Sequence, residues 1–538
     1  MRVAIRVDAS AEMGTGHLRR CLSLAAELAR FGAEVILVCR SLDKAASSVL
    51  SGFDFPVLWL PAPDLAESSS LVGSAVEPPH AAWACVSWSR DARETVEVLR
   101  YKVPDWVVVD HYAFDARWHQ QIHKNLCCRL AVIDDLADRA LAADFLLDHN
   151  WAPDHKVKYA SRILAVNGTL LRILGGPRYA LLDTAYKNAP RYSFHPEVRS
   201  IGIFMGGTDP LRVSSQVLEV CRADVGFAGR IEVVSTSANP YLADLIDACA
   251  SYPNTTLTLD EPSLADFFAR HDLQIGAGGG ATWERCCIGV PSILLTLAKN
   301  QRVVTPALAG LGALKQATLG LFQNKDAAGI RLSDALADVL VEVLSHSDLR
   351  CRLAQTAAAL VDGRGAERVA LCLLGETLRL RKATASDAPM LYSWRNDPSV
   401  RRASLQAAEI AYDEHESWML QVLADSSRFL LIGQISGHAV GCIRFDCEAD
   451  NTAVVSLYLD PAVQGLGIGA RLLISGERFL AARATSAFTV IADVVAGNKA
   501  SQRLFTACGY VGGPMRYHKQ MDPEPDANSN HNLYYENS

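Results

Sequence analysis

A histidine close to the N-terminus stands where a general base could act. His17 follows the turn 14–16 (Gly-Thr-Gly), between the apolar run Val3–Val7 and the helical pattern Leu18–Phe31. An imidazole exchanges its proton near neutral pH, and glycines beside it let a ligand approach closely. We therefore interpret His17 as a catalytic base at the end of the first strand.

A second polar group follows another expected strand. Asp110-His111-Tyr112 comes directly after the apolar run Trp106–Val109. The carboxyl ends of parallel strands share one sheet edge, so these side chains are expected at the same edge as the histidine. There they could position a sugar or orient the base.

Two glycine-rich turns follow strands in the middle of the chain. The first contains Gly207 and Thr208, and the second contains Gly279 and Gly280. Backbone N–H groups at the start of a helix attract phosphate, although a single turn of this kind is as readily structural. Two such turns favour phosphate binding. Glu284, one helical turn further, could bind the hydroxyls of a ribose.

Two histidines have the spacing of metal ligands on a helix. His119 and His123 lie four residues apart, but no third ligand accompanies them. We expect both to face solvent and to bind no metal.

A third glycine-rich loop lies near the C-terminus. Residues 463–469 (VQGLGIG) follow the strand pattern Ala453–Leu459 and open the helix Ala470–Arg483. A row of amides before a helix suits a pyrophosphate. The residues that would bind it are Gln464, Gly465, Gly467, Gly469 and, later in the chain, Asn498.

Three successive segments must position these side chains. Strands and helices alternate through 1–192 and again through 193–376, which predicts two tandem α/β lobes with parallel sheets. Residues 377–522 show a shorter α+β pattern. Residues 523–538 are rich in Pro, Asn and Asp, and we expect a disordered tail.

Composition excludes several classes of protein. The chain has 538 residues with 52 basic and 59 acidic side chains, and it contains no basic block that would favour nucleic acid. We find neither a signal-peptide pattern nor an apolar run long enough for a membrane helix. Its 14 cysteines show no Cys-x-x-Cys spacing. We expect a cytoplasmic enzyme whose cysteines are mostly buried thiols.

The first 372 residues resemble the UDP-sugar hydrolases of pseudaminic acid biosynthesis. The segments that carry this resemblance, in order, are 6–10, 14–20, 110–112, 176–182, 205–209, 235–240 and 299–301. The resemblance implies a two-lobed GT-B-like (MurG-like) fold. It also implies metal-independent hydrolysis of UDP-2,4-diacetamido-2,4,6-trideoxy-β-L-altropyranose at the anomeric carbon, with water activated by His17.

The resemblance also implies which residues contact the UDP-sugar. Amides around the two glycine-rich turns would hold the developing diphosphate charge. The residues assigned to the substrate are Asp110, Tyr112, Gly207, Thr208, Gly279, Gly280, Glu284 and Asn300.

The C-terminal segment resembles the GCN5-related N-acetyltransferases (GNAT), and 391–401 and Glu414-His415 are similar to the sugar-nucleotide acetyltransferases of the same pathway. This implies acetyl-CoA as cosubstrate and a 4-amino UDP-sugar as acceptor. His415 is either an acceptor-site residue or a packed histidine.

One position departs from the acetyltransferase pattern. Phe505 stands where many of these enzymes have the tyrosine that protonates the leaving thiolate. Tyr510, Tyr517, Ser501 or water could replace it.

The sequence therefore predicts a bifunctional enzyme that acts on small UDP-sugars, with no nucleic-acid or membrane partner. Two alternatives remain. One is a GT-B glycosyltransferase that uses another UDP-sugar, joined to a GNAT domain that acts on a different amine. The other is a nucleotide-sugar-binding protein with a decayed transferase domain.

Overall fold

The computed structural model describes residues 1–64, 77–164, 171–298, 301–317, 332–448, 450–513 and 515–523. Asn300 and all of the expected tail except Pro523 lie outside this part of the chain. The contacts between residues divide the chain into two units. One contains Arg2–Ala26 and Val35–Ala366, and the other contains Met1, Glu27–Glu34 and Glu367–Ser538. The expected boundaries at 192/193 and 376/377 remain predictions.

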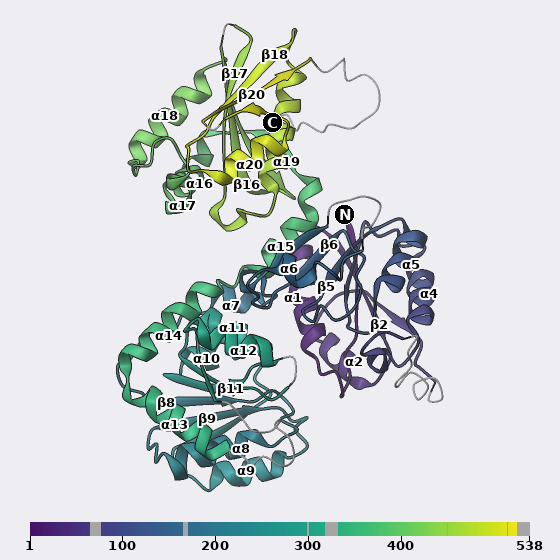
Figure 1. Ribbon diagram of the computed structural model, residues 1–538, viewed down its shortest axis with the longest axis vertical. Helices are drawn as coiled ribbons and strands as arrows, with labels where there is room; N and C mark the ends of the chain where they lie inside the picture. The colour runs from purple at the N-terminus through teal and green to yellow at the C-terminus, as the bar shows by residue number, and fades with distance from the viewer. Residues whose placement is uncertain are drawn as a thin grey trace. The chain divides into compact units, whose positions relative to one another are not determined.

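The first sheet has seven strands in the order β3-β2-β1-β4-β5-β6-β7, drawn in purple to blue in Figure 1. Its strands are β1 (Arg2–Val7), β2 (Glu34–Arg40), β3 (Val57–Leu60), β4 (Trp106–Asp110), β5 (Arg129–Ile133), β6 (Phe145–Asp148) and β7 (Arg172–Gly175). The pairs β1–β4, β4–β5, β5–β6, β6–β7 and β2–β3 are parallel. Every residue of β4 is buried, as expected for a parallel strand covered on both faces.

Helices connect these strands. They are α1 (Gly16–Arg30), α2 (Lys44–Leu50), η1 (Ala81–Ala84), α4 (Trp88–Leu99), α5 (Ala116–Leu126), α6 (His155–Tyr159), η2 (Pro177–Tyr179) and α7 (Thr184–Asn188). A core of buried aliphatic and aromatic side chains, with Phe114 and Trp118 among the largest, packs between strands and helices. Helix α1 begins at Gly16 and ends at Arg30, within two residues of the expected range Leu18–Phe31.

The second sheet has six strands in the order β10-β9-β8-β11-β12-β13. They are β8 (Ser200–Phe204), β9 (Arg230–Ser235), β10 (Thr255–Leu259), β11 (Leu273–Ala277), β12 (Ser292–Leu295) and β13 (Lys315–Ala317). All five pairs are parallel. The connecting helices are α8 (Val213–Glu219), η3 (Val220–Asp224), α9 (Leu242–Ala250), α10 (Leu264–Ala269), α11 (Ala281–Ile288), α12 (Gln301–Gly310), α13 (Leu332–Ser345) and α14 (Ser347–Leu360).

Both sheets follow the order 3-2-1-4-5-6 of a dinucleotide-binding fold, counted from the first strand of each. In such sheets the chain adds strands toward one edge from strand 1 to strand 3, and toward the opposite edge from strand 4 onward. Ligands bind at this reversal of strand order, outside the carboxyl ends of strands 1 and 4. The reversal lies at β1/β4 in the first sheet and at β8/β11 in the second. Two tandem lobes of this kind form the GT-B-like fold that the sequence predicts.

The third sheet is mixed, with the order β14-β15-β16-β17-β18-β20-β19. Its strands are β14 (Arg379–Lys382), β15 (Arg428–Ile435), β16 (His438–Cys447), β17 (Thr452–Leu459), β18 (Phe488–Asp493), β19 (Val511–Gly512) and β20 (Arg516–Met521). The expected hairpin is β15–β16, with the turn at Ser436 and Gly437, both of which have positive φ. Only β17 and β18 pair in parallel.

Helices precede and follow the strands of this third sheet. They are α15 (Gly365–Leu373), η5 (Leu374–Thr377), η6 (Ala385–Asp387), α16 (Ala388–Asn396), α17 (Pro398–Arg402), α18 (Tyr412–Ala424), η7 (Pro461–Val463), α19 (Ile468–Ala481) and α20 (Lys499–Ala507). The parallel register of β17 and β18 extends only from Thr452 to Val454, although β17 continues to Leu459. The two strands therefore separate toward their carboxyl ends.

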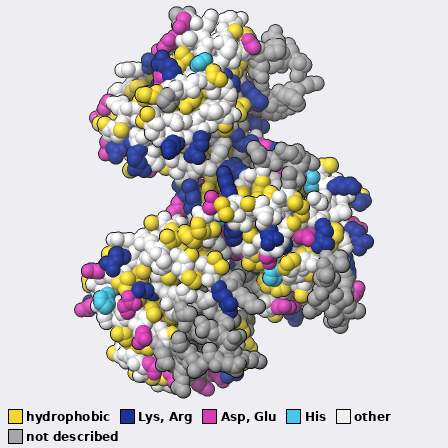
Figure 2. Space-filling model, viewed as in Figure 1, with side chains coloured by type: hydrophobic (Ala, Val, Ile, Leu, Met, Phe, Trp, Pro, Cys, Tyr) yellow, Lys and Arg dark blue, Asp and Glu magenta, His cyan; other side chains and the backbone are white. Residues whose placement is uncertain are grey.

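Surface and side-chain chemistry agree with the composition. On the face shown in Figure 2, Lys and Arg side chains are scattered among Asp and Glu. All 14 cysteines are free thiols and most are buried, as the sequence predicts. Among the described residues, no helix is long and apolar enough to cross a membrane. The same residues contain no cluster of three His, Cys, Asp or Glu side chains that could hold a metal.

Candidate functional site

His17 forms a tight pair with Asp110 at the direction reversal of the first sheet. His17 lies in the first turn of α1, and Asp110 ends β4, where it pairs in register with Val7 of β1. The His17 Nδ1 and an Asp110 carboxylate oxygen are 2.7 Å apart. The His17 side chain is 11% exposed, whereas that of Asp110 is fully buried. The sequence thus predicted two residues that the fold brings into contact.

This contact fixes the state of the imidazole. An ionised carboxylate can only accept a hydrogen bond, here from Nδ1–H, so the lone pair of neutral His17 lies on Nε2. No described residue hydrogen-bonds that Nε2. A histidine oriented in this way by a carboxylate can take a proton from water and is stabilised once it is charged. Asp110 therefore fixes the orientation of the His17 ring, and the role of His17 as a base stays a prediction.

Arg20 is a residue that the sequence reasoning missed. It lies one turn after His17 on α1 and donates to both oxygens of Asp110, at 2.6 Å each. Burial alone would raise the pKa of Asp110, but Arg20 and then His17 outweigh it and hold that pKa well below its ordinary value. The i, i+3 spacing of His17 and Arg20 was the available signal.

Aromatic rings surround the other side of His17. The rings of Tyr112 and of Trp83, which lies in η1, are both edge-on to the imidazole. Their centroids are 4.7 and 6.1 Å from that of His17. The Tyr112 hydroxyl donates a short hydrogen bond to Asp135, which follows β5. Trp83 was not expected, because no sequence pattern connects η1 to this sheet edge.

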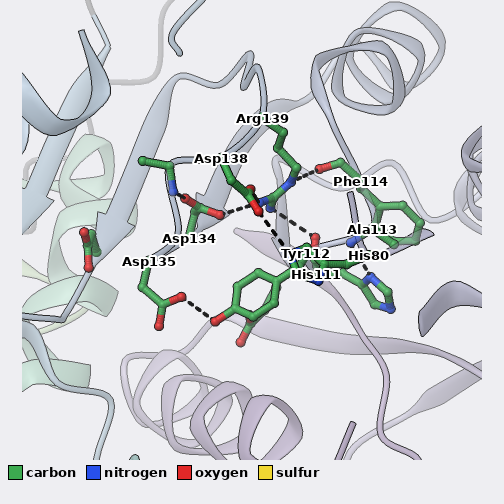
Figure 3. Close-up of polar contacts among 12 residues, drawn as sticks. His80, His111, Tyr112, Ala113, Phe114, Asp134, Asp135, Asp138 and Arg139 are labelled. Atoms are coloured by element: carbon green, nitrogen blue, oxygen red, sulfur yellow. Dashed lines mark hydrogen bonds and ion pairs between the residues drawn. The ribbon is translucent and has the colours of Figure 1, made fainter. Parts of the chain in front are cut away.

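Two of the carboxylates after β5, those of Asp134 and Asp138, are held by one arginine, as Figure 3 shows. Arg139 donates to Asp134 at 2.7 Å and to Asp138 at 3.1 Å. Asp138 also contacts His80 at 3.0 Å, and His80 has the positive φ of a left-handed residue next to η1. This network ties η1 to the loop after β5, beside Tyr112.

The first glycine-rich turn is already occupied by the protein's own groups. Asp209 accepts from the amides of Val213 and Ser214 at 2.9 and 2.8 Å, and so caps α8. The Gly207 carbonyl accepts from Thr236, and a Cβ on Gly207 would meet that side chain at 3.0 Å. Close packing therefore explains Gly207, and a phosphate would have to compete with the carboxylate of Asp209 at this helix.

The second glycine-rich turn differs. Helix α11 begins after Gly280, and no side chain caps it. Gly280 has an ordinary helical φ of −55°, and a Cβ added there meets nothing within 4 Å. A Cβ on Gly279 would meet only Gln301, at 3.8 Å. Neither backbone conformation nor packing demands glycine at these two positions, which is the pattern expected where a ligand approaches the backbone.

A chain of hydrogen bonds joins α11 to the surroundings of His17. The Trp283 Nε1 donates to the side-chain oxygen of Asn150 at 3.1 Å, and the side-chain nitrogen of Asn150 donates to Asp135 at 2.9 Å. Asp135 accepts in turn from Tyr112. Glu284, next to Trp283, is half-buried; burial raises its pKa despite a hydrogen bond from Tyr186.

One expectation is wrong. His119 does not face solvent: it is 1% exposed and its Nδ1 accepts from the Ala142 amide at 3.2 Å. Burial, followed by the charge of Arg139, lowers its pKa to about 3. The helix was placed correctly, but its buried face includes this residue. His123 is half-buried and contacts the Cys128 carbonyl at 2.8 Å.

A cavity of about 370 Å³ opens where β17 and β18 separate. Helix α20 contributes Asn498, Ser501 and Phe505 to its wall, and helix α18 contributes His415 and Trp418. The first three share one face of α20, since they are three and four residues apart.

The matching family model accounts for this third sheet. Residues 377–511 match the model described as an acetyltransferase (GNAT) domain. The C-terminal part of the chain is a GNAT acetyltransferase domain.

Other known proteins are similar to this chain over longer stretches. A spore coat polysaccharide biosynthesis protein, SpsG, of Bacillus subtilis (strain 168) is 26% identical over 215 residues, which span 40% of this chain and 60% of SpsG. An uncharacterized protein of Methanocaldococcus jannaschii is 22% identical over 438 residues, 78% of each chain. The solved structure of Acinetobacter baumannii MurG is similar with a TM-score of 0.46 and 13% identity, over 69% of this chain and 98% of that one.

The glycine-rich loop of the GNAT domain is open at the start of α19. Gly465 and Gly467 have φ values of +81° and +66°, which favour glycine. Gly467 precedes α19, and no side chain caps this helix. Gln464 is the C-cap of η7 (Pro461–Val463), and Gly469 lies in the first turn of α19. These amides fit the pyrophosphate of acetyl-CoA.

Asn498 has a structural role in the GNAT domain in addition to its place in the cavity wall. Its oxygen accepts from the Ser501 amide, and its nitrogen donates to the Ala403 carbonyl, both at 3.0 Å. The side chain therefore caps α20 and ties it to the residues after α17. Whether it also contacts acetyl-CoA stays a prediction.

The cavity narrows the choice of a group that could replace the missing tyrosine. Ser501 and Tyr458 line it, but Tyr510 and Tyr517 are not among its lining residues. The two latter rings instead pack against Phe505, with centroids 5.0 and 6.2 Å away. The sequence reasoning missed Tyr458, which lies on β17. Burial raises the pKa of its hydroxyl well above the ordinary value.

Proposed function

We propose that the chain catalyses two steps on one UDP-sugar. The GNAT domain acetylates the 4-amine of a UDP-4-amino-4,6-dideoxy-β-L-AltNAc precursor. The GT-B-like lobes then hydrolyse the resulting UDP-2,4-diacetamido-2,4,6-trideoxy-β-L-altropyranose to the free sugar and UDP. The proposed partners are small molecules in the cytoplasm. The observation that carries the hydrolase assignment is the His17–Asp110 pair, with Nε2 left to a water.

The hydrolytic step follows from this pair. Nε2 of His17 removes a proton from water as the oxygen attacks the anomeric carbon, and the bond from that carbon to the diphosphate oxygen breaks. Asp110 stabilises the imidazolium that forms. The amides of Gly279 and Gly280, before the uncapped α11, are the donors proposed to hold the charge on departing UDP.

The acetyl transfer is supported by the GNAT domain and its cavity. The amides of the loop around Gly467 are proposed to bind the pyrophosphate of acetyl-CoA, and the cavity is proposed to hold the thioester next to the acceptor amine. SpsG supports a role for the first part of the chain in carbohydrate biosynthesis, since that relative is a polysaccharide biosynthesis protein.

The test uses NMR of the 4-amino UDP-sugar incubated with acetyl-CoA and the full chain. The expected result is a new acetamido signal, followed by cleavage of the anomeric C–O bond and release of UDP. Acetylation without cleavage contradicts the hydrolase assignment. Transfer of the sugar to an added acceptor instead of water would identify a glycosyltransferase.

A substitution at His17 tests its proposed role as the general base. His17→Ala is expected to stop UDP release, with about a 10²–10⁴-fold loss of kcat, while UDP-sugar binding and acetylation persist. Unchanged hydrolysis in this variant would refute the assignment of His17.

A further inference from the structure

One histidine that lines the cavity of the GNAT domain has a buried ring nitrogen without a partner among the described residues. His415 lies on α18, is 3% exposed and lines the cavity. Its Nε2 is buried and makes no hydrogen bond with any described residue. A buried polar atom without a partner is rare and points to a ligand or to chemistry.

The other ring nitrogen is fixed by the backbone. His415 hydrogen-bonds the backbone of Ala388, the first residue of α16, and this bond favours the charged ring. Such a bond is one that Nδ1–H donates to a carbonyl, because Nε2 has no partner. The lone pair of the neutral ring is therefore on Nε2, on the residue that lines the cavity.

The surroundings keep this ring neutral. Burial, followed by the charge of Arg395 on α16, lowers the pKa of His415 below 6.5. The Tyr392 and Trp418 rings pack against it with centroids 5.8 and 5.6 Å away. The carboxylate on the neighbouring η6, Asp387, is already paired with an arginine at 2.6 Å. At neutral pH the ring therefore has a lone pair available.

We propose that His415 is the general base of acetyl transfer, which takes a proton from the acceptor amine inside the cavity. This inference rests on the proposed acetyltransferase function and adds a catalytic residue to it. Its basis is the buried, unpartnered Nε2 of a residue that lines the cavity proposed for the transfer.

The step balances as follows. Nε2 of His415 takes one proton from the ammonium form of the acceptor, and the freed amine attacks the carbonyl carbon of acetyl-CoA. The C–N bond forms and the C–S bond breaks, so the thiolate leaves with the electron pair. As the tetrahedral intermediate collapses, the nitrogen loses a second proton. The thiolate of CoA takes up this proton and becomes a thiol. The products are the acetamide, CoA and one proton released from His415.

The kinetic test compares His415→Gln with wild-type protein, using acetyl-CoA and the 4-amino UDP-sugar. The expected result is a loss of about 10²–10⁴-fold in kcat at pH 7, with an unchanged Kd for acetyl-CoA. The wild-type kcat is expected to rise with pH to a plateau whose midpoint lies below 6.5, and the variant should lack this rise. His518→Gln, an exposed histidine on β20, is the matched control.

A second measurement is independent of turnover. ¹⁵N-histidine NMR of the full chain, with His415 assigned by its absence in His415→Gln, reports the protonation state. Neutral His415 with the proton on Nδ1 at pH 7 supports the proposal. A cationic ring, or a proton on Nε2, overturns it.

The two tests separate the two ideas. If wild-type protein does not acetylate the amine, the proposed acceptor is wrong, and the NMR result still decides the state of His415. If wild-type protein acetylates the amine and His415→Gln keeps kcat within threefold with the same pH profile, the general-base proposal fails while the proposed function stands.

Discussion

Three side chains, and not one histidine alone, make the candidate base in the first lobe. Asp110 touches both His17 and Arg20, and Arg20 Nη2 lies 3.1 Å from His17 Nδ1. The full negative charge on Asp110 is secured by the arginine, so Nδ1–H of the histidine always has an acceptor. Arg20 therefore acts on the chemistry through Asp110.

Asp110→Asn tests this arrangement. The amide removes the negative charge, and its NH₂ group can donate to Nδ1, which would place the imidazole proton on Nε2 and block the base. We expect kcat for UDP release to fall by about 10²–10⁴-fold. The Kd for the UDP-sugar should change little, because Asp110 is fully buried.

The control for this variant is Asp115→Asn, at the N-cap of α5 in the same lobe. Asparagine caps a helix as well as aspartate does, so its activity should match wild type. A kcat for Asp110→Asn within threefold of wild type would show that the carboxylate does not orient the base.

His119 is expected to make stability depend on pH. Its pKa is about 3 in the folded state and 6.5 in the unfolded state, so between these values the unfolded chain binds one more proton. The free energy of unfolding should therefore fall as pH decreases, by about 1.4 kcal/mol per pH unit from this residue.

Urea unfolding followed by tryptophan fluorescence measures this dependence. His119→Gln should reduce the loss of stability between pH 6.5 and pH 5 by about 2 kcal/mol. His518→Gln, whose side chain is exposed, should keep the wild-type slope. Equal slopes in wild type and His119→Gln would contradict a neutral, buried imidazole.

At the scale of elements, the two glycine-rich turns of the second lobe are not equivalent. Both follow strands at the direction reversal of the sheet, β8 and β11. Helix α8 is capped by Asp209, whereas α11 has no side-chain cap. The difference lies in the carboxylate of Asp209. It repels a phosphate, and it accepts hydrogen bonds from the amides that a phosphate would need.

Gly280→Trp tests whether α11 receives the diphosphate. The position has open space and an ordinary φ, so the side chain fits the fold and extends toward any ligand. We expect the Kd for UDP, measured by calorimetry, to rise at least 100-fold. Gly310→Trp, which ends α12 and also meets nothing within 4 Å, should bind UDP as wild type does. Tight UDP binding by Gly280→Trp would exclude this helix terminus.

At the scale of the whole molecule, the contacts between residues separate two units, and each proposed site lies within one of them. His17 and α11 belong to the first, and the acyl-transfer cavity to the second. We therefore expect that a substitution in one unit can abolish its activity while the activity of the other unit persists.

Gly467→Trp tests this independence. It should abolish acetyl-CoA binding, measured by calorimetry, and leave hydrolysis of the diacetamido UDP-sugar unchanged. Because Gly467 has a φ of +66°, the substitution also strains the backbone, by about 1–2 kcal/mol. Gly437→Trp imposes the same kind of strain at a hairpin turn with a φ of +80° and should retain both activities. Loss of both activities in Gly467→Trp alone would show that the units depend on each other.

The sequence by itself determined the order of elements and the residue types at the strand ends. Apolar runs such as Trp106–Val109, glycine turns and helical periodicity are local signals, and they placed β1, α1 and β4 within a few residues. They also selected His17 and Asp110 and indicated acetyl-CoA at the loop 463–469.

Only the tertiary structure decided which of these residues meet and which partners they take. The pairing of β1 with β4 joins His17 to Asp110 across 93 residues, and the packing around α18 leaves Nε2 of His415 buried and without a partner among the described residues. Folding likewise buried His119 and let Asp209 cap α8. Periodicity says which face of a helix is apolar, but hydrogen bonds and burial depend on distant strands and helices, so the sequence pattern does not contain them.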